Sequence, residues 1–209
     1  MLKLGFVSKK TNQEIKKMVK KVKVEIKELH KEEIEVSING ITPLLMEKMD
    51  MCVVEFYDGK KGKKGVQKDN RTEQEKVEKK IHCDREGNPI IPSNMFMRCL
   101  EEVAPYIEGL DKKRIKGSVR FVTTEIPLRY TDQTINKTYG KTSGITKSPR
   151  LILRPQFNEW SCKFKIIYNA GLVSVEQIFN AFNIAGFNIG IGGWRPICGG
   201  DYGQFEVSK

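Results

Sequence analysis

The densest group of residues suited to ligand chemistry is the segment 186–203, GFNIGIGGWRPICGGDYG. Its glycines can adopt positive φ and bring backbone close to a ligand, and successive N–H groups can form an anion-binding nest. A guanidinium at Arg195 suits phosphate and an indole at Trp194 suits base stacking. The pattern predicts a nucleic-acid contact by Gly190, Gly192, Gly193, Trp194, Arg195, Gly199, Gly200 and Tyr202. The alternative is a tight structural connection in which Trp194 fills the core.

A second group lies in residues 127–157, which show no strong helix or strand period. Loops of roughly this length inside a domain are uncommon and usually functional. Cations here can reach phosphates, and aromatic rings between them can stack on bases. The predicted binding residues are Lys137, Tyr139, Lys141, Lys147, Arg150 and Arg154. The alternative is a surface hairpin with incidental charge.

Candidate catalytic residues are sparse. The two histidines, His30 and His82, have no evident partner base, and with Asp50 they are only weak candidates. The five cysteines are scattered without a CxxC pair, which argues against a metal site and favours reduced thiols buried as small apolar groups. We expect no metal, no cofactor and no catalytic residue.

Composition points to a polyanionic partner. The 209-residue chain has 37 Lys and Arg against 26 Asp and Glu, a net charge of +11, which suits phosphate contacts. The basic excess gathers in residues 1–32, 59–71 and 126–157. No apolar run is long enough to span a membrane and the first residues do not resemble a signal peptide, so we expect one cytoplasmic domain.

Periodicity gives an order of elements that must position these residues. Around the core we expect a short helix running into a strand in 11–32, a turn at Asn39-Gly40, a short helix over 42–51, a loop over 58–71, a helix over 73–80 and a hairpin about 84–88. The core itself reads as strand 33–39, helix 93–104 capped by Ser93, strand 115–126, strand 159–168, helix 174–185 with a Ser174–Gln177 capping box, and strand 203–208. This is an α+β fold with the ferredoxin-like βαββαβ order that RNA-recognition motifs share, carrying two basic insertions.

The glycine-rich segment resembles a known family. Its pattern of GIG at 190–192, WRP at 194–196 and GGDYGQF at 199–205, set between the last helix and the last strand, is similar to the C-terminal glycine-rich loop of the RAMP superfamily, the RNA-binding proteins of CRISPR systems. Residues 41–45, ITPLL, resemble the segment after the first strand of the backbone-forming RAMP subunits. The WRP spacer departs from the family's simple polar linker. The whole also looks like small stand-alone proteins of phages and other mobile elements.

The resemblance implies one RAMP-like domain over 1–209, an insertion over 52–92, and a thumb-like insertion over 127–157 that crosses the bound strand. It implies a non-catalytic protein that grips single-stranded nucleic acid, RNA in preference to DNA, by its phosphates, as side-by-side copies or with other subunits of a ribonucleoprotein. One alternative is a RAMP-type metal-independent endoribonuclease using His30 or His82, or an acidic residue after the first strand such as Asp50 or Glu47. Another is a basic structural or protein-interaction factor of a phage or mobile element.

Overall fold

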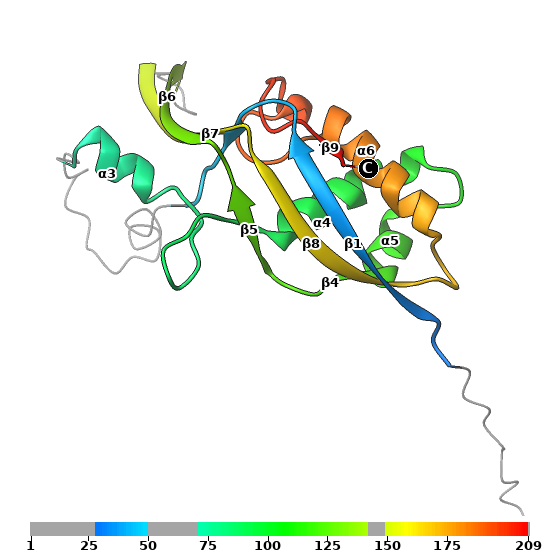
Figure 1. Cartoon of the computed structure of the whole chain (residues 1–209). Coiled ribbons are helices and arrows are strands. Elements are labelled where there is room, and N and C mark those ends of the chain that lie inside the picture. The colour runs from blue at the N-terminus through cyan, green and yellow to red at the C-terminus, as the bar shows by residue number, and fades with distance from the viewer. Residues whose placement is uncertain (1–27, 50–70, 142–148, 209) are drawn as a thin grey trace, which may run out of the picture.

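The fold is α+β. A computed structural model describes residues 28–49, 71–141 and 149–208 (Figure 1). Its elements in chain order are β1 (Lys31–Gly40), β2 (Leu44–Leu45), α3 (Glu73–Glu78), β3 (Ile90–Pro92), α4 (Ser93–Val103), the 3-10 turn η1 (Ala104–Tyr106), α5 (Lys112–Ser118), β4 (Val119–Phe121), β5 (Glu125–Arg129), β6 (Asp132–Lys141), β7 (Pro149–Asn158), β8 (Ser161–Asn169), α6 (Val175–Asn188), η2 (Pro196–Cys198) and β9 (Phe205–Val207).

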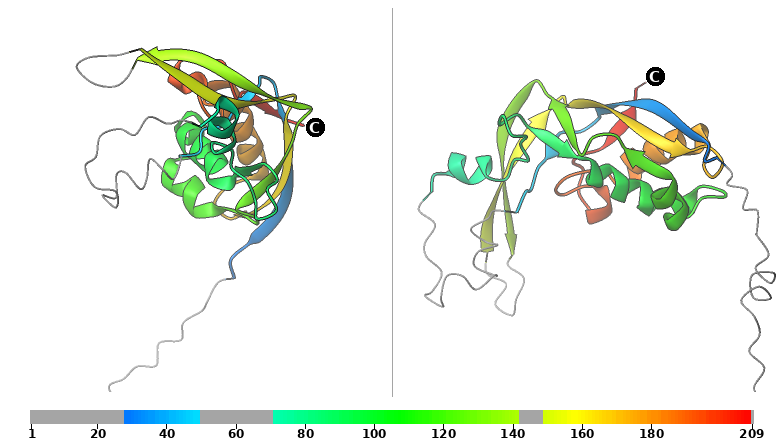
Figure 2. Two further views of the ribbon diagram at one scale, coloured as in Figure 1. Left: turned by 90° about the vertical axis from the view of Figure 1, so that its left-hand side faces the viewer. Right: turned by 90° about the horizontal axis from the view of Figure 1, so that it is seen from below.

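A central antiparallel sheet has the strand order β3-β5-β8-β1-β9, with β4 also paired to β8. Helices α4, α5 and α6 lie against one face and leave the other face open (Figure 2). The alternating sequence of β8 explains this layering, because side chains in a strand point to opposite faces in turn. Towards the helices β8 buries Cys162, Phe164, Ile166 and Tyr168, and towards solvent it exposes Lys163 and Lys165.

Aromatic side chains tie the helices to this sheet. The ring of Phe96 on α4 lies 5.1 Å from Phe164 and 5.6 Å from Phe205, between centroids. The predicted apolar stripe of α4 is confirmed, with Phe96, Cys99, Leu100 and Val103 buried and Met95 half-buried. The predicted capping box of α6 is also confirmed, since Ser174 and Gln177 each accept from the other's backbone N–H.

A second sheet, β2-β7-β6, carries a long hairpin that projects away from the central sheet and its helices (Figure 2). Strands β6 and β7 pair over ten positions, from Asp132↔Asn158 to Lys141↔Pro149. Residues 127–157 thus contain the end of β5 and this hairpin. The sequence hides β6 because β6 has little buried on either face and so lacks an apolar alternation. Strand β7 buries Leu153, Pro155 and Phe157 in alternation, a pattern that the sequence analysis missed.

The strand predicted over 115–126 is only partly present, as β4 and the first residues of β5. Residues 112–118 form α5, capped by Asp111, whose carboxylate accepts from the backbone N–H of Arg114 at 2.8 Å. Two short strands, β4 and β5, follow. An N-cap followed by lysine and arginine favours a helix turn, and α5 buries Ile115 and Ser118, three residues apart on one helix face. Ile115 is the only large apolar residue of α5, so the sequence carries little helical periodicity there.

The helix predicted over 42–51 is wrong where the structure describes it. Leu44 and Leu45 form β2, which pairs with β7. These two consecutive residues are both buried, as in a strand covered on both faces. The turn predicted at Asn39-Gly40 is not a turn, because both residues remain in β1. Gly40 is needed there because a Cβ would lie 2.2 Å from the Trp160 indole.

Smaller differences concern the elements around β3. The predicted N-cap at Ser93 is wrong, because Ser93 is the first residue inside α4 and Pro92 is the N-cap. No side chain caps this end of the helix. The predicted hairpin about 84–88 is confirmed. The Asp84 carboxylate accepts from the backbone N–H groups of Glu86 and Asn88, Cys83 and Pro89 form an antiparallel bridge, and the Ile90 N–H donates to the His82 carbonyl at 2.8 Å. Strand β3 also pairs with β5. The helix over 73–80 is confirmed as α3. The predicted helix after residue 11 and loop over 58–70 lie outside the described residues, and no described helix is long and apolar enough to cross a membrane.

Candidate nucleic-acid interface

The segment 186–203, called here the glycine loop, begins in the last turn of α6 and leads to β9. It is hydrogen-bonded to the segment around β2. The N–H of Gly193 donates to the Leu45 carbonyl at 2.7 Å, and the N–H of Gly203 donates to the Pro43 carbonyl at 2.9 Å. The Met46 N–H in turn donates to Pro155 of β7 at 3.1 Å. The β2 segment therefore fastens the glycine loop to the base of the β6–β7 hairpin, and the two groups of residues that the sequence singled out meet at this junction.

Close packing accounts for the glycines of the loop. A Cβ on Gly192 would lie 2.3 Å from the Leu45 carbonyl oxygen, and one on Gly200 would lie 2.0 Å from that of Trp194. The backbone N–H groups that we expected to form an anion nest mostly have carbonyl partners inside the protein: those of Gly190, Gly193, Gly199, Gly200 and Gly203. The glycines thus shape the loop, and ligand contacts fall to its side chains.

Trp194 and Tyr202 form the aromatic part of the junction. Their rings are stacked, with centroids 6.2 Å apart and planes 16° apart, and Trp194 is 45% exposed, so it does not fill the core as the alternative expected. The Tyr202 hydroxyl accepts from the amide of Asn136 on β6 at 3.2 Å, which ties the pair to the hairpin. Trp194 has a φ of 50°, a left-handed conformation that costs energy for a bulky residue.

Arg154 of β7 holds the hairpin against the glycine loop. Its Nε donates to a carboxylate oxygen of Glu47 at 3.0 Å, and a terminal nitrogen donates to the Thr138 hydroxyl at 3.4 Å. Its side chain is only 13% exposed, and Gly193 lies so close that a Cβ there would be 3.3 Å from Nε. Arg154 is therefore mainly a clamp between β7 and the segment after β2.

Lys137 and Tyr139 lie on the other face of the hairpin, beside α3. Lys137 forms an ion pair with Glu73 of α3, and Tyr139, two residues further along β6, is 84% exposed. The hairpin candidates thus divide between its two faces. Lys141 and Arg150 occupy the last register positions towards the tip, Lys141↔Pro149 and Gly140↔Arg150, and Lys147 lies outside the described residues.

Arg195 points away from the hairpin. It lines a hollow beside α4 together with Arg98 and Ile189, while its neighbour Trp194 stacks on Tyr202. The glycine loop therefore presents an aromatic side chain on the hairpin side and a cation on the α4 side. Sequence reasoning missed Arg98, because a single arginine on the polar side of a helix carries no local signal.

The residues weighed for catalysis do not converge. His30 precedes β1 at the sheet end far from the hairpin, and His82 lies in the loop after α3 (Figure 1). Burial lowers the pKa of His82, and the charge of Lys48 adds to the effect. Glu47 is paired with Arg154, and Asp50 lies outside the described residues. Among the residues that the structure describes, no group of three His, Cys, Asp or Glu side chains is placed to hold a metal ion.

Two of the four described cysteines, Cys99 and Cys162, are buried, and burial raises the pKa of each thiol to about 12. They act as small apolar groups, as the sequence predicted. Cys198 of η2 is exposed, and Cys83 is half-buried. Cys52 lies outside the described residues.

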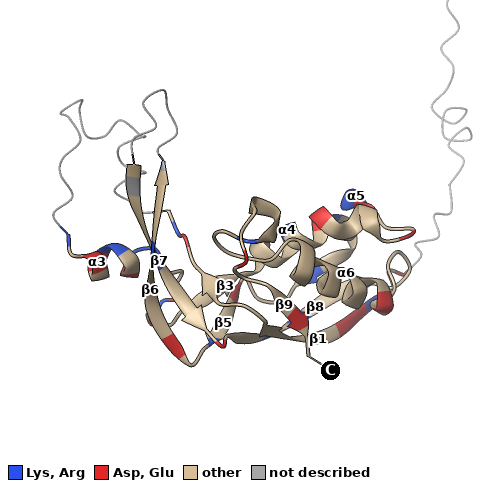
Figure 3. Ribbon diagram, turned by 90° about the horizontal axis from the view of Figure 1, so that it is seen from above, with Lys and Arg blue, Asp and Glu red and all other residues tan. Residues whose placement is uncertain are grey.

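The open face of the central sheet differs from the junction. On this face Lys163 pairs with Glu35 at 2.8 Å and Lys165 pairs with Glu33 at 2.9 Å. Acidic and basic residues alternate over the described elements rather than forming one cationic side (Figure 3). In total the described residues carry 21 Lys and Arg against 20 Asp and Glu, so ten of the eleven net positive charges belong to segments outside them.

Comparison with known proteins gives a fold relationship. No protein-family model matches the chain, and no curated protein matches it. Among solved structures, a chain from the cryo-EM structure of the Type III-B Cmr-beta complex bound to cognate target RNA matches with a TM-score of 0.54 at 18% identity, covering 86% of this chain and 60% of that one. Cmr6 from Pyrococcus furiosus gives a TM-score of 0.43 at 10% identity, covering 87% of this chain and all of that one. The protein thus shares its fold with the Cmr-beta chain and spans about 60% of that chain's length.

Proposed function

We propose that this protein is a non-catalytic, RAMP-like protein that binds single-stranded RNA at the junction of the β6–β7 hairpin and the glycine loop. The observation that carries the proposal is Trp194, a half-exposed tryptophan in a left-handed conformation, stacked on Tyr202 at the base of a projecting hairpin. Backbone strain of this kind persists only where surrounding structure enforces it, and it concentrates at functional sites.

The chemistry of the junction suits a strand with unpaired bases. Stacking on an exposed aromatic ring stabilises a bound base by about 1–3 kcal/mol and requires no particular sequence. Trp194 on the glycine loop and Tyr139 on the other face of the hairpin provide two such rings. Duplex bases are already stacked on each other, so these rings favour single strands over duplex.

The fold relationship supports the same assignment. The Cmr-beta structure holds target RNA, and we extend RNA binding from that complex to this chain. In this proposal residues 1–209 form one RAMP-like domain on a ferredoxin-like core, with β1, α4, β4 with β5, β8, α6 and β9 as its βαββαβ order. Residues 52–92 and 127–157 are its two insertions, the second being the thumb that crosses the strand.

Phosphate contacts in this proposal come from Arg195 and from three cations that the sequence predicted. Arg195 has no ion-pair partner among the described residues. The three others that we propose are Lys141, Lys147 and Arg150. Copies of the chain lie side by side along the strand, or alongside other subunits of a ribonucleoprotein.

The test is fluorescence-anisotropy binding of the full chain to labelled single-stranded RNA, single-stranded DNA and duplex over a range of salt concentrations. About six phosphate contacts on a single strand give a log-log salt slope near −4. Combining Trp194→Ala with Tyr139→Ala should weaken single-strand binding by about a hundredfold, from two stacking contacts.

The matched control is the double variant Lys163→Gln with Lys165→Gln, which removes two cations that are already paired on the open face. Its affinity should equal that of the wild type. Gel analysis of the same RNA should show no cleavage. Binding that is insensitive to salt, or equal losses in the two double variants, would refute the proposal.

A further inference from the structure

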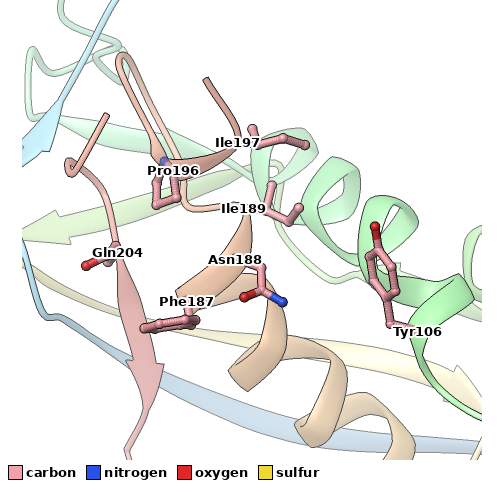
Figure 4. Close-up of a pocket in the computed structure, with 7 residues that line it drawn as sticks. All are labelled: Tyr106, Phe187, Asn188, Ile189, Pro196, Ile197 and Gln204. Carbon is pink, nitrogen blue, oxygen red and sulfur yellow. The ribbon is translucent and has the colours of Figure 1, made fainter. Parts of the chain in front are cut away.

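A groove runs along α4 on the side of the glycine loop that faces away from the hairpin. Arg98 and Glu102 lie four residues apart on one face of α4 and line one part of the groove, and Tyr106 of η1 lines the other part. The end of α6 and the segment from Arg195 to Ile197 form the opposite wall. The groove contains two hollows of about 340 and 480 Å³ that share Ile189 as a lining residue. Figure 4 shows the larger of the two.

The smaller hollow is lined by two arginines and two glutamates. Arg98 and Arg195 line it, and neither has an ion-pair partner among the described residues. The Nε of Arg195 is buried without a hydrogen-bond partner in the described structure. A buried, unsatisfied donor costs about 1–3 kcal/mol, so this site is set up for an acceptor.

The carboxylates that also line this hollow are already engaged. Glu102 pairs with Lys112 of α5 at 3.2 Å, and Glu101 with Lys116 at 3.6 Å. The floor adds no charge, because burial keeps the Cys99 thiol protonated, and its sulfur lies 3.1 Å from the carbonyl of Gly190. What remains is a pair of guanidinium groups, whose planar donors match the oxygens of a phosphate.

The larger hollow is apolar and aromatic. Tyr106 is 72% exposed, Phe187 69% and Ile197 49%, an unusual group of large apolar side chains left open to solvent. The amides of Asn188 and Gln204 lie among them (Figure 4). Aromatic rings provide stacking surfaces for a base, and amide groups can donate to and accept from its edge.

We propose that this groove binds one nucleotide, with its phosphate on Arg98 and Arg195 and its base against Phe187 and Tyr106. A nucleotide joins one phosphate to one flat aromatic base, and the two hollows present a matching pair of surfaces. They adjoin through Ile189, and the consecutive residues Arg195 and Pro196 line one each. The nucleotide is either a free mononucleotide or one nucleotide of the bound RNA strand. The assignment to the strand rests on the proposed function.

The first test is isothermal titration calorimetry of the full chain with AMP, GMP, CMP, UMP, adenosine and inorganic phosphate. A mononucleotide should bind about tenfold more tightly than adenosine or inorganic phosphate alone, because only it fills both hollows. Arg98→Gln and Phe187→Ala should each weaken mononucleotide binding by about tenfold. Both side chains are exposed, so both variants should unfold at the wild-type temperature.

The second test identifies the source of the nucleotide. Single-stranded RNAs of one sequence, with a 5′-phosphate, a 3′-phosphate or hydroxyl ends, are compared on wild type and Arg98→Gln. A loss confined to one phosphorylated end assigns the groove to that end, and an equal loss for all three assigns it to an internal nucleotide. The control Lys163→Gln, on the open face, should change none of these affinities.

The two proposals fail separately. If wild type binds mononucleotides through Arg98 but binds no strand, the groove stands and the proposed function fails. If wild type binds strands but Arg98→Gln and Phe187→Ala alter neither strand nor mononucleotide binding, the groove is not a nucleotide site and the proposed function stands.

Discussion

The open face of the central sheet and the junction at the hairpin base are both polar surfaces of one domain, but they are built differently. On the open face, lysines of β8 are each held by a glutamate of β1, at 2.8 and 2.9 Å. At the junction, the half-exposed ring of Trp194 stacks on Tyr202, and the nearby Arg154 is paired with Glu47. Arg195, on the far side of the loop, has no carboxylate partner in the described structure. Charge alone does not distinguish them.

The difference matters because RNA-recognition motifs bind through aromatic residues on the open face of a similar sheet. Here the large exposed aromatic residues among those described, Tyr106, Tyr130, Tyr139, Phe187 and Trp194, all lie outside that sheet. Exposed ion pairs contribute little stability and neutralise the surface for a phosphate backbone. Sharing a fold order with RNA-binding domains therefore does not place the ligand on the same surface.

The largest effect should come from the backbone of the junction. In Gly203→Ala the new Cβ would lie 1.9 Å from the Ile191 carbonyl oxygen, at a φ of 69° that L residues rarely adopt. We expect a loss of about 3 kcal/mol or more in the free energy of unfolding, from overpacking plus strain. Urea denaturation followed by circular dichroism measures it.

Gly199→Ala is the matched control for this prediction. Gly199 has a φ of 78° in the same loop, but nothing lies within 4 Å of the added Cβ. Strain alone should cost about 1 kcal/mol. Equal losses in the two variants would show that Gly203 is not packed against the Ile191 carbonyl as described.

The Arg154 clamp should give the next largest effect. Arg154→Met keeps the aliphatic stem and removes the charge, which leaves Glu47 without its partner. Because Glu47 is 44% exposed and water can solvate it, we expect a loss of about 1–2 kcal/mol in unfolding free energy rather than the larger cost of a fully buried pair. Lys165→Met on the open face, with its pair exposed, should cost less than Arg154→Met. A larger loss of unfolding free energy in Lys165→Met than in Arg154→Met would mean that the open-face ion pair, and not the Arg154 clamp, is the more stabilising of the two.

The two regions also differ in how well sequence predicts them. The alternating pattern of β8 and the Ser174–Gln177 capping box specify the sheet and α6 locally, and both predictions are confirmed. Residues 42–51 and 115–126 were misassigned because their conformation depends on partners distant in sequence, such as Phe157 for Leu44. The junction residues were found from their types, but only the fold shows that Arg154 is clamped and that Arg98 joins Arg195.

Unmasking the open face should convert it towards a binding surface. Combining Glu33→Gln with Glu35→Gln frees Lys163 and Lys165 from their carboxylates. Two additional phosphate contacts would steepen the log-log salt slope for single-stranded RNA by about 1.4 and raise affinity several-fold at low salt. Anisotropy titrations over a salt series measure both quantities. An unchanged slope would mean that the open face is excluded from the nucleic acid for reasons other than its charge.

The smallest effect concerns pH, through His82 at the foot of the hairpin. Burial lowers the pKa of His82 in the folded protein, so the unfolded chain binds a proton more readily at this residue. Its contribution to stability is therefore present above the ordinary histidine pKa of about 6.5 and is lost as pH falls below it. His82→Asn should lose less stability than wild type between pH 7.5 and 5.5, measured by urea denaturation at each pH. His30→Asn, at an exposed position before β1, should retain the wild-type difference. If His82→Asn shows the wild-type difference instead, the burial of His82 does not govern the acid sensitivity.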